Sequence, residues 1–445
     1  AARRLGEAYT NRLSAGDWAA ARDLALRLQA EFEHTEAGRR AKVPVVVATR
    51  PAGATLLHEG VPLMRTVDGT RVPVLTPGLV LCQADKPIEL VAQLAGFEPK
   101  RIVVDGKANA QVDVVLAVVP DRRIAFDDPA QTGVGVGDGW VAVGLRGGRV
   151  GLARTDGSNR EVRDLEGLKA AEGAPVIRQG RLFFVSNEST IECLPLVPGA
   201  HAKGWPVRLQ SPPATSLMVA EGRVAIVDQD GVLQCWEQAS GHRLWSVQLG
   251  SAPSGPPTID QRRVHIGTAD GRILVFDATD GRSAGILRSP ANPTTRIHAR
   301  DGVLYFGCSD EALRAVDFAA GKVLWTESLG RVPTDVDLAV GRGGVVVAAA
   351  GRLVSIEPAT GVVRGKIDVD APVLGVTVRG ARAFLQTRKP RTRRDPAYDV
   401  LQAFDVETLE LLWEHELDGT GPGLLGVDDL VVALPSATGE IVLFR

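Results

Sequence analysis

A single phrase recurs along most of this chain. Its best copy, at residues 301–325, reads DGVLYFGCSDEALRAVDFAAGKVLW, and weaker copies return roughly every 40 residues from about residue 133 to the end. Each copy contains two short apolar strands bordered by turns that contain Gly or Asp. Glycine supplies the positive φ of a tight hairpin, and β-branched and aromatic residues pack well on a pleated surface. The repeat therefore predicts a fold in which one small β-unit is built many times.

The aligned copies give two columns of strands with eight members each. Second strands begin near residues 139, 180, 222, 263, 302, 344, 381 and 429, and third strands near residues 148, 190, 231, 271, 313, 351, 400 and 439. A repeat of this length made of short strands is typical of a β-propeller. The sequence predicts a mainly-β protein with an eight-bladed β-propeller over residues 119–445.

The eighth predicted blade is incomplete, because the chain ends at Arg445 after a third strand. An open strand edge is a template for aggregation, so another segment should pair with it. Residues 122–127, which read RRIAFD just before the first blade, are partly apolar and have no other assignment. We expect this segment to form the outer strand of the eighth blade and to close the ring.

A third column combines an acidic residue at the end of the third strand with a tryptophan eight residues later. Its members are the pairs Glu237 and Trp245, Asp317 and Trp325, and Asp405 and Trp413. The column resembles the repeat of pyrroloquinoline-quinone (PQQ)-type propellers, as in quinoprotein dehydrogenases. The resemblance implies that the acidic residue caps a turn and that the indole docks between blades. Gly285 and Gly365 replace the tryptophan in blades four and six, where we expect weaker docking.

The cofactor does not follow from this resemblance. Dehydrogenases of the class also carry a vicinal cysteine pair and a calcium site, whereas Cys82, Cys193, Cys235 and Cys308 are not adjacent in the sequence. The chain also has no Walker A sequence, no complete kinase catalytic loop and no His-Glu-x-x-His motif. We expect no cofactor, no metal site and no catalytic residue, so a quinone-dependent dehydrogenase is disfavoured and the chain is predicted not to be an enzyme.

Two smaller units precede the propeller. Residues 1–42 are predicted to form a helical hairpin, because the apolar residues from Trp18 to Phe32 follow helical spacing and Gly16-Asp17 breaks and caps the chain. The phrase AGDWAAA at residues 15–21 resembles part of a tetratricopeptide-type hairpin. Such a hairpin either packs on a neighbour or belongs to a longer helical array, and a linker without a binding role is the alternative.

Residues 43–118 are predicted to form a small β-sandwich-like domain. The turns at 51–54 and 76–78 and the Gly96-Phe97 pair resemble a PEGA domain, a β-module of bacterial surface and envelope proteins. Pro73 is expected to lie on a sheet edge. The one ionisable pair of note, His58-Glu59, falls in a predicted loop and indicates no chemistry.

Charge and hydropathy limit the partners. The formal net charge of −2 gives no electrostatic reason to expect nucleic acid or an anionic membrane. We recognise no apolar run long enough to cross a membrane and no signal peptide. Because the first residue is not Met, we expect a fragment or a processed chain, with any membrane anchor upstream.

A basic segment interrupts the repeat between the second and third strands of blade seven. Residues 388–397 read RKPRTRRDPA, and the five basic residues are Arg388, Lys389, Arg391, Arg393 and Arg394. Insertions on a rigid scaffold commonly carry recognition, and guanidinium groups suit carboxylate or phosphate partners. These five are the candidate partner-binding residues, and a solvated hairpin tip is the alternative.

The order of helical hairpin, PEGA-like domain and PQQ-like propeller resembles the extracytoplasmic region of bacterial serine/threonine kinases. This resemblance implies a non-catalytic sensor of a membrane receptor in the cell envelope or periplasm, with a kinase domain upstream. It would bind a protein, peptide or cell-wall ligand on a propeller face, although no residue pattern identifies that ligand. The alternative is an envelope scaffold comparable to the propeller subunit of outer-membrane assembly machinery.

Overall fold

The computed structural model of this protein describes residues 1–164, 171–186, 189–197, 202–390, 397–417, 419–421, 425–427, 432–436 and 438–444. The chain forms two compact units. The first comprises residues 1–119 with 411–415, and the second comprises residues 120–410 with 416–445.

Three helices open the first unit: α1 (Ala2–Ser14), α2 (Trp18–Phe32) and α3 (Glu36–Arg40). The predicted break holds, because the Asp17 carboxylate accepts a hydrogen bond from the Ala20 amide at 3.2 Å and caps α2. Ala21, Ala25 and Leu28 are fully buried in a cluster that includes Val43, so the hairpin packs on the chain that follows it. Trp18 lies at the edge of this stripe and is 42% exposed.

The rest of the first unit is a β-module. Its strands are β1 (Val43–Arg50), β2 (Thr55–His58), β3 (Val61–Pro62), β4 (Met64–Val67), β5 (Thr70–Pro73), β6 (Gly78–Cys82), β7 (Ile88–Gln93), β8 (Lys100–Val104) and β9 (Gln111–Val115). They form sheets of order β6-β1-β9 and β3-β2-β7-β8 and a separate β4-β5 hairpin. Alternate residues of both larger sheets, such as Val45 and Leu90, share one apolar core. Pro73 ends β5 in the two-stranded hairpin, where each strand is an edge.

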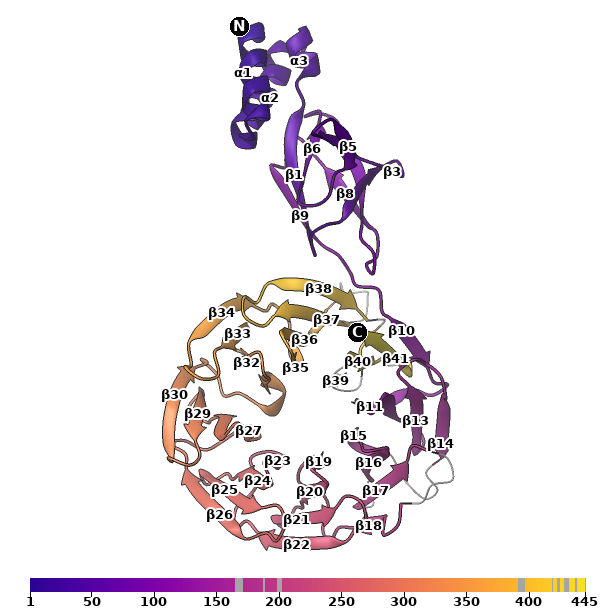
Figure 1. The fold of residues 1–445 in the computed structure, drawn as a ribbon, viewed down its shortest axis with the longest axis vertical. Helices are drawn as coiled ribbons and strands as arrows, with labels where there is room; N and C mark the ends of the chain where they lie inside the picture. The colour runs from indigo at the N-terminus through magenta and orange to yellow at the C-terminus, as the bar shows by residue number, and fades with distance from the viewer. Residues whose placement is uncertain are drawn as a thin grey trace. The chain divides into compact units, whose positions relative to one another are not determined.

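The second unit is a succession of four-stranded antiparallel sheets, consistent with a β-propeller (Figure 1). Within the described residues there are eight such sheets. The first four are β11 (Ala130–Gly137), β12 (Trp140–Leu145), β13 (Arg149–Arg154), β14 (Glu161–Asp164); β15 (Ala171–Arg178), β16 (Arg181–Ser186), β17 (Thr190–Pro195), β18 (Val207–Arg208); β19 (Met218–Ala220), β20 (Arg223–Val227), β21 (Val232–Glu237), β22 (Arg243–Gln248); and β23 (Thr258–Asp260), β24 (Arg263–Gly267), β25 (Arg272–Asp277), β26 (Ser283–Arg288).

The remaining sheets follow in chain order, except that the last one takes its outer strand from the start of the unit. They are β27 (His298–Arg300), β28 (Val303–Gly307), β29 (Ala312–Asp317), β30 (Lys322–Ser328); β31 (Leu338–Val340), β32 (Val345–Ala349), β33 (Arg352–Ile356), β34 (Val363–Asp368); β35 (Val373–Arg379), β36 (Arg382–Lys389), β37 (Tyr398–Asp405), β38 (Leu411–Glu416); and β39 (Gly426–Val427), β40 (Val432–Pro435), β41 (Glu440–Phe444), β10 (Arg122–Ala125). A 3₁₀ turn, Asp335–Asp337, precedes β31. Below, each sheet is called a blade, numbered from β11–β14 as blade one.

The blades surround a centre toward which the first strand of each blade lies, while the fourth strand lies on the rim (Figure 1). The middle strands are buried on both sides: β12, β32 and β40 have no exposed residue. The turns have the predicted glycine chemistry, since Gly231 and Gly271 open third strands with φ of 76° and 83°.

The expected closing strand is confirmed over Arg122–Ala125. This strand, β10, pairs antiparallel with β41 and places Ile124 opposite Ile441. Ile124 and Phe126 are 3% and 4% exposed. A Cβ added to Gly151 would lie 2.9 Å from the Phe126 ring, so Phe126 packs on the backbone of blade one. The first segment of the unit therefore joins its last blade to its first.

Candidate partner-binding site

Two kinds of loop lie together at one end of the blades. One joins the second and third strands within a blade, and the other leads from the fourth strand to the next blade. Isolated β-bridges join the two kinds in three successive blades, between Pro213 and Asp228, Pro253 and Thr268, and Pro293 and Cys308. We call the surface formed by these loops the loop face. The opposite ends of the antiparallel blades carry the turns between strands one and two and between strands three and four.

The basic insertion belongs to the loop face of blade seven, but its two ends continue the sheet. β36 runs to Lys389 and β37 begins at Tyr398, with Arg388 opposite Asp399 and Lys389 opposite Tyr398. Two of the five candidate residues, Arg388 and Lys389, therefore lie in a strand. The other three, Arg391, Arg393 and Arg394, lie outside the described residues.

Arg388 is bound within the protein. Its Nε and Nη2 donate to the two carboxylate oxygens of Asp399 at 2.8 and 3.2 Å, and Nη2 also donates to the Gly421 carbonyl at 3.1 Å. Asp399 is fully buried and also accepts the Gly421 amide at 2.8 Å. Hydrogen bonds to Asp399 raise the pKa of Arg388. The pair joins the end of β36 and the start of β37 to the neighbouring loop at Gly421, so Arg388 has a structural role.

Two of the three predicted docking tryptophans, Trp245 and Trp325, share one geometry. Trp245 Nε1 donates to the Ala278 carbonyl at 3.1 Å and Trp325 Nε1 to the Pro358 carbonyl at 2.8 Å, each 33 residues further along the chain. Both side chains are 8% exposed and Trp413 is 7% exposed. A Cβ added to Gly361 would lie 2.4 Å from the Trp325 ring. Each of these two indoles therefore packs on the glycine turn of the following blade.

Where Gly285 replaces the tryptophan of blade four, an aromatic side chain of the next blade fills the space. A Cβ added to Gly285 would lie 3.0 Å from the ring of Phe318, which stands in the turn position that Ala278 and Pro358 hold elsewhere. The Arg263 guanidinium lies 5.0 Å above this ring, and His265 meets it edge-on at 6.1 Å. The gap expected at Gly285 is therefore filled from the opposite side of the interface.

The acidic members of the column cap turns. Asp405 accepts from the Glu407 and Thr408 amides at 2.9 and 3.0 Å, and these bonds, that from Thr408 foremost, lower its pKa. Asp317 accepts from the Ala320 amide at 2.9 Å. Glu237 accepts from the Ser240 hydroxyl.

The described residues contain neither a recognisable metal site nor an exposed cysteine thiol. Among them, no group of three His, Cys, Asp or Glu side chains could hold a metal ion. Cys82, Cys193, Cys235 and Cys308 are buried and free, and burial raises the pKa of Cys193 and of Cys235 to about 12. In the same part of the chain, every helix falls short of the length and apolarity that crossing a membrane requires.

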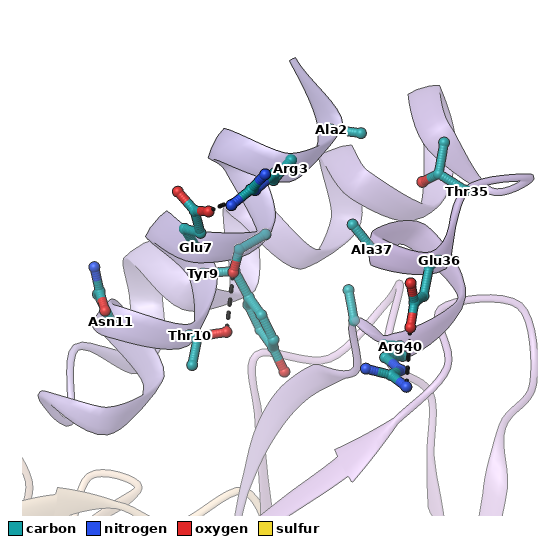
Figure 2. A pocket seen from close by; sticks show the side chains of 12 residues that line it. Ala2, Arg3, Glu7, Tyr9, Thr10, Asn11, Thr35, Glu36, Ala37 and Arg40 are labelled. Carbon is teal, nitrogen blue, oxygen red and sulfur yellow. Dashed lines mark hydrogen bonds and ion pairs between the residues drawn. The ribbon is translucent and has the colours of Figure 1, made fainter.

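The first unit has a groove of its own between α1 and α3, with a volume of about 900 Å³ (Figure 2). An ion pair lies on each helix, Arg3 with Glu7 at 3.1 Å and Glu36 with Arg40 at 2.9 Å. Below them, the Tyr9 hydroxyl donates to the Lys42 carbonyl at 2.8 Å. Because each ion pair neutralises its own two charges, these residues give no reason to expect an anionic rather than a cationic ligand in the groove.

The ring of four-stranded blades and its docking column define a PQQ-type β-propeller. The family model described as "Outer membrane protein assembly factor BamB" matches residues 197–338 and 309–444, which together exceed half of the chain. The chain belongs to this family.

Individual relatives resemble this chain at low sequence identity. BamB of Nitrosomonas eutropha is 27% identical over 168 residues, which cover 37% of this chain and 40% of that protein. The match thus spans two fifths of the length of the curated relative. Among solved structures, BamB from Moraxella catarrhalis has a TM-score of 0.59 at 16% identity, covering 74% of this chain and 99% of that one. Sqt1 of Saccharomyces cerevisiae has 0.57 at 11% identity, with 74% and 98% covered. These two structures show the fold alone.

Proposed function

We propose that this chain is a non-catalytic, protein-binding scaffold of the cell envelope that acts in outer-membrane protein assembly. The family match over residues 197–444 is the observation that carries this proposal. It supports the scaffold, which the sequence offered as an alternative, better than the kinase sensor. Neither the kinase-sensor interpretation nor the PEGA-like assignment of residues 43–118 gains support from the match.

In this proposal the propeller is eight-bladed and occupies residues 119–445. The helical hairpin (1–42) and the β-sandwich-like module (43–118) are separate domains. The scaffold works on the extracytoplasmic side of the membrane, without inserting into it. A chain that serves by binding needs no cofactor, and the buried thiols with raised pKa values agree with that role.

The loop face of blade seven is the proposed docking site. Buried Asp399 binds both Arg388, near the end of β36, and the Gly421 amide, so the strand ends that flank the basic insertion are rigidly held. Arg391, Arg393 and Arg394 then present positive charge to an acidic surface on a partner protein.

The test is capture of partners from a solubilised outer-membrane fraction by the immobilised chain, with mass spectrometry of what is retained. We expect components of the outer-membrane assembly machinery, and we expect the triple variant Arg391→Ser, Arg393→Ser, Arg394→Ser to retain fewer of them. The control carries Arg282→Ser, Lys322→Ser and Arg342→Ser, three exposed cations in or directly beside turns at the opposite ends of the blades.

Three results would contradict parts of the proposal. Failure of the unmodified chain to enrich any assembly component would remove the scaffold role. Turnover of ATP, or of an alcohol with added quinone and calcium, would show that the chain is an enzyme. Equal capture by the triple variant and its control would move the docking site away from blade seven.

A further inference from the structure

A separate cavity of about 240 Å³ lies inside the propeller unit. It is lined by the first strands of three successive blades, β27, β31 and β35, by the loops that lead into β27 and β31, and by Leu425. Figure 1 shows β27 and β35 on the side of their blades that faces the centre of the ring. The cavity is thus a feature of the ring interior and is distinct from the insertion on blade seven.

The charged residues of this cavity break the repeat. The entering loops of blades three to six align on Pro213, Pro253, Pro293 and Pro333, which are 40 residues apart. In that alignment Arg296 takes the place of Ser216, Pro256 and Val336, and Asp335 takes that of Thr215, Gly255 and Thr295. His298 likewise replaces Met218, Thr258 and Leu338. The other aligned loops lack these three side chains, so the propeller repeat does not require them. All three line the same cavity.

Arg296 and Asp335 face each other across neighbouring loops without closing on each other. One Asp335 oxygen accepts the Arg296 backbone amide, while the other lies 3.9 Å from Arg296 Nε. Among the described residues, the Arg296 guanidinium makes no other polar contact. The backbone bond holds the carboxylate in place, so the guanidinium keeps most of its donors for something else.

Gly255, in the entering loop of blade four, makes room for this arrangement. A Cβ at that position would lie 2.7 Å from the Arg296 amide nitrogen and 3.2 Å from Asp335 Oδ2. Three successive loops therefore converge on the charged pair, and the absence of a side chain at Gly255 is part of the fit.

The remaining lining consists of a neutral imidazole, one threonine (Thr377) and an otherwise apolar wall. His298 Nε2 is buried and has no hydrogen-bond partner within the described residues. Burial, reinforced by the charge of Arg296, lowers the pKa of His298 to about 3, so the ring stays neutral near pH 7. The apolar wall is formed by Val336, Leu338, Val340, Val376 and Val378.

We propose that this cavity binds a small aliphatic α-amino acid. Its carboxylate would pair with Arg296, its ammonium group with Asp335, and its side chain would lie against the valines. The cavity holds one charge of each sign, so a zwitterion leaves no charge uncompensated, whereas a plain carboxylate or a plain amine leaves one charge in the cavity without a partner. At about 240 Å³, the space is smaller than a typical drug-sized pocket and suits a ligand of this size.

Isothermal titration calorimetry of the full chain tests this with four probes: L-valine, L-leucine, 4-methylpentanoate, which lacks the ammonium group, and isopentylamine, which lacks the carboxylate. We expect saturable binding of at least one amino acid. Both singly charged probes should bind at least about tenfold more weakly than L-leucine, because each leaves a cavity charge unpaired.

Two variants locate the site. Arg296→Gln should abolish binding, whereas Arg282→Gln, at a side chain 88% exposed on the propeller surface, should not change it. Asp335→Asn keeps an oxygen that can accept the Arg296 amide and removes the negative charge. This variant should therefore bind 4-methylpentanoate more tightly than the unmodified chain does. Circular dichroism confirms that each variant is folded.

The inference is wrong if neither amino acid binds at millimolar concentration, or if folded Arg296→Gln binds as the unmodified chain does. If Asp335→Asn kept the unmodified chain's preference for L-leucine over 4-methylpentanoate, the proposal of a zwitterion site would also be wrong.

Discussion

At the scale of single residues, blade-to-blade contacts follow a rule of complementary size. Trp245 and Trp325 each pack on a turn of the next blade that contains a glycine and, in place of Phe318, Ala278 or Pro358. Where Gly285 replaces the indole, Phe318 of the next blade fills the interface from the other side. The tryptophan column was predictable from spacing alone. The role of Phe318 was not, because it depends on which turn lies opposite Gly285 in space.

The first prediction tests this rule. Trp325→Ala should lower the free energy of unfolding by about 3–5 kcal/mol, the usual cost of emptying a large aromatic site. Gly361→Ala should also destabilise, because its Cβ would lie 2.4 Å from the indole and its φ is 74°. In the Trp325→Ala background only the backbone strain of about 1–3 kcal/mol should remain. Urea denaturation of the double-mutant cycle measures the coupling, and additive effects would show that the indole and the turn do not touch.

The second prediction concerns acid stability. His265 is 4% exposed, and burial, followed by the charge of Arg263, lowers its pKa to about 4. The unfolded chain, with a His pKa of about 6.5, binds this proton more readily than the folded chain does. Stability from this group is therefore complete above about pH 6.5 and is lost as pH falls toward 4, by up to about 3 kcal/mol.

His265→Gln should flatten this part of the curve of unfolding free energy against pH. His242→Gln, at an exposed position, is the matched control and should leave the curve unchanged. A variant curve as steep as that of the unmodified protein between pH 6.5 and 4 would assign the effect to other groups.

At the scale of elements, the closing strand was predictable because the last blade lacks a fourth strand and one unassigned apolar segment remains. The anchor of the insertion was not predictable. Asp399 looks like an ordinary polar residue after a basic run, and its role appears only when β36, β37 and the loop at Gly421 come together.

The third prediction belongs to β10. Ile124→Asp would place a carboxylate in the apolar cluster between the first and last blades and should cost about 2–4 kcal/mol. Freed of its partner, the edge of β41 should promote self-association. Ala125→Ser, at an exposed position of the same strand, is the control. Unchanged melting and a monomeric sedimentation profile for Ile124→Asp would mean that β10 does not hold the ring closed.

At the scale of the whole molecule, the sequence predicted the repeated part well, because each blade contains the same local signals for strand and turn. It could not identify the cavity at Arg296 and Asp335, since the two residues lie 39 positions apart and only the ring places their loops side by side. The family match also bears on the choice between two functions. The order of domains in the sequence suggested a receptor, whereas the family match over the repeats supports an envelope scaffold.

The central claim is that the loop face of blade seven contacts a component of the outer-membrane assembly machinery. Site-specific photo-crosslinking in the native envelope tests it most directly, with the crosslinker placed at Arg393 and, as control, at Arg282 in a turn at the opposite ends of the blades. We expect a crosslink to an assembly component from position 393 and none from position 282. Equal crosslinking from both positions, or crosslinks from 393 only to proteins unrelated to assembly, would contradict it.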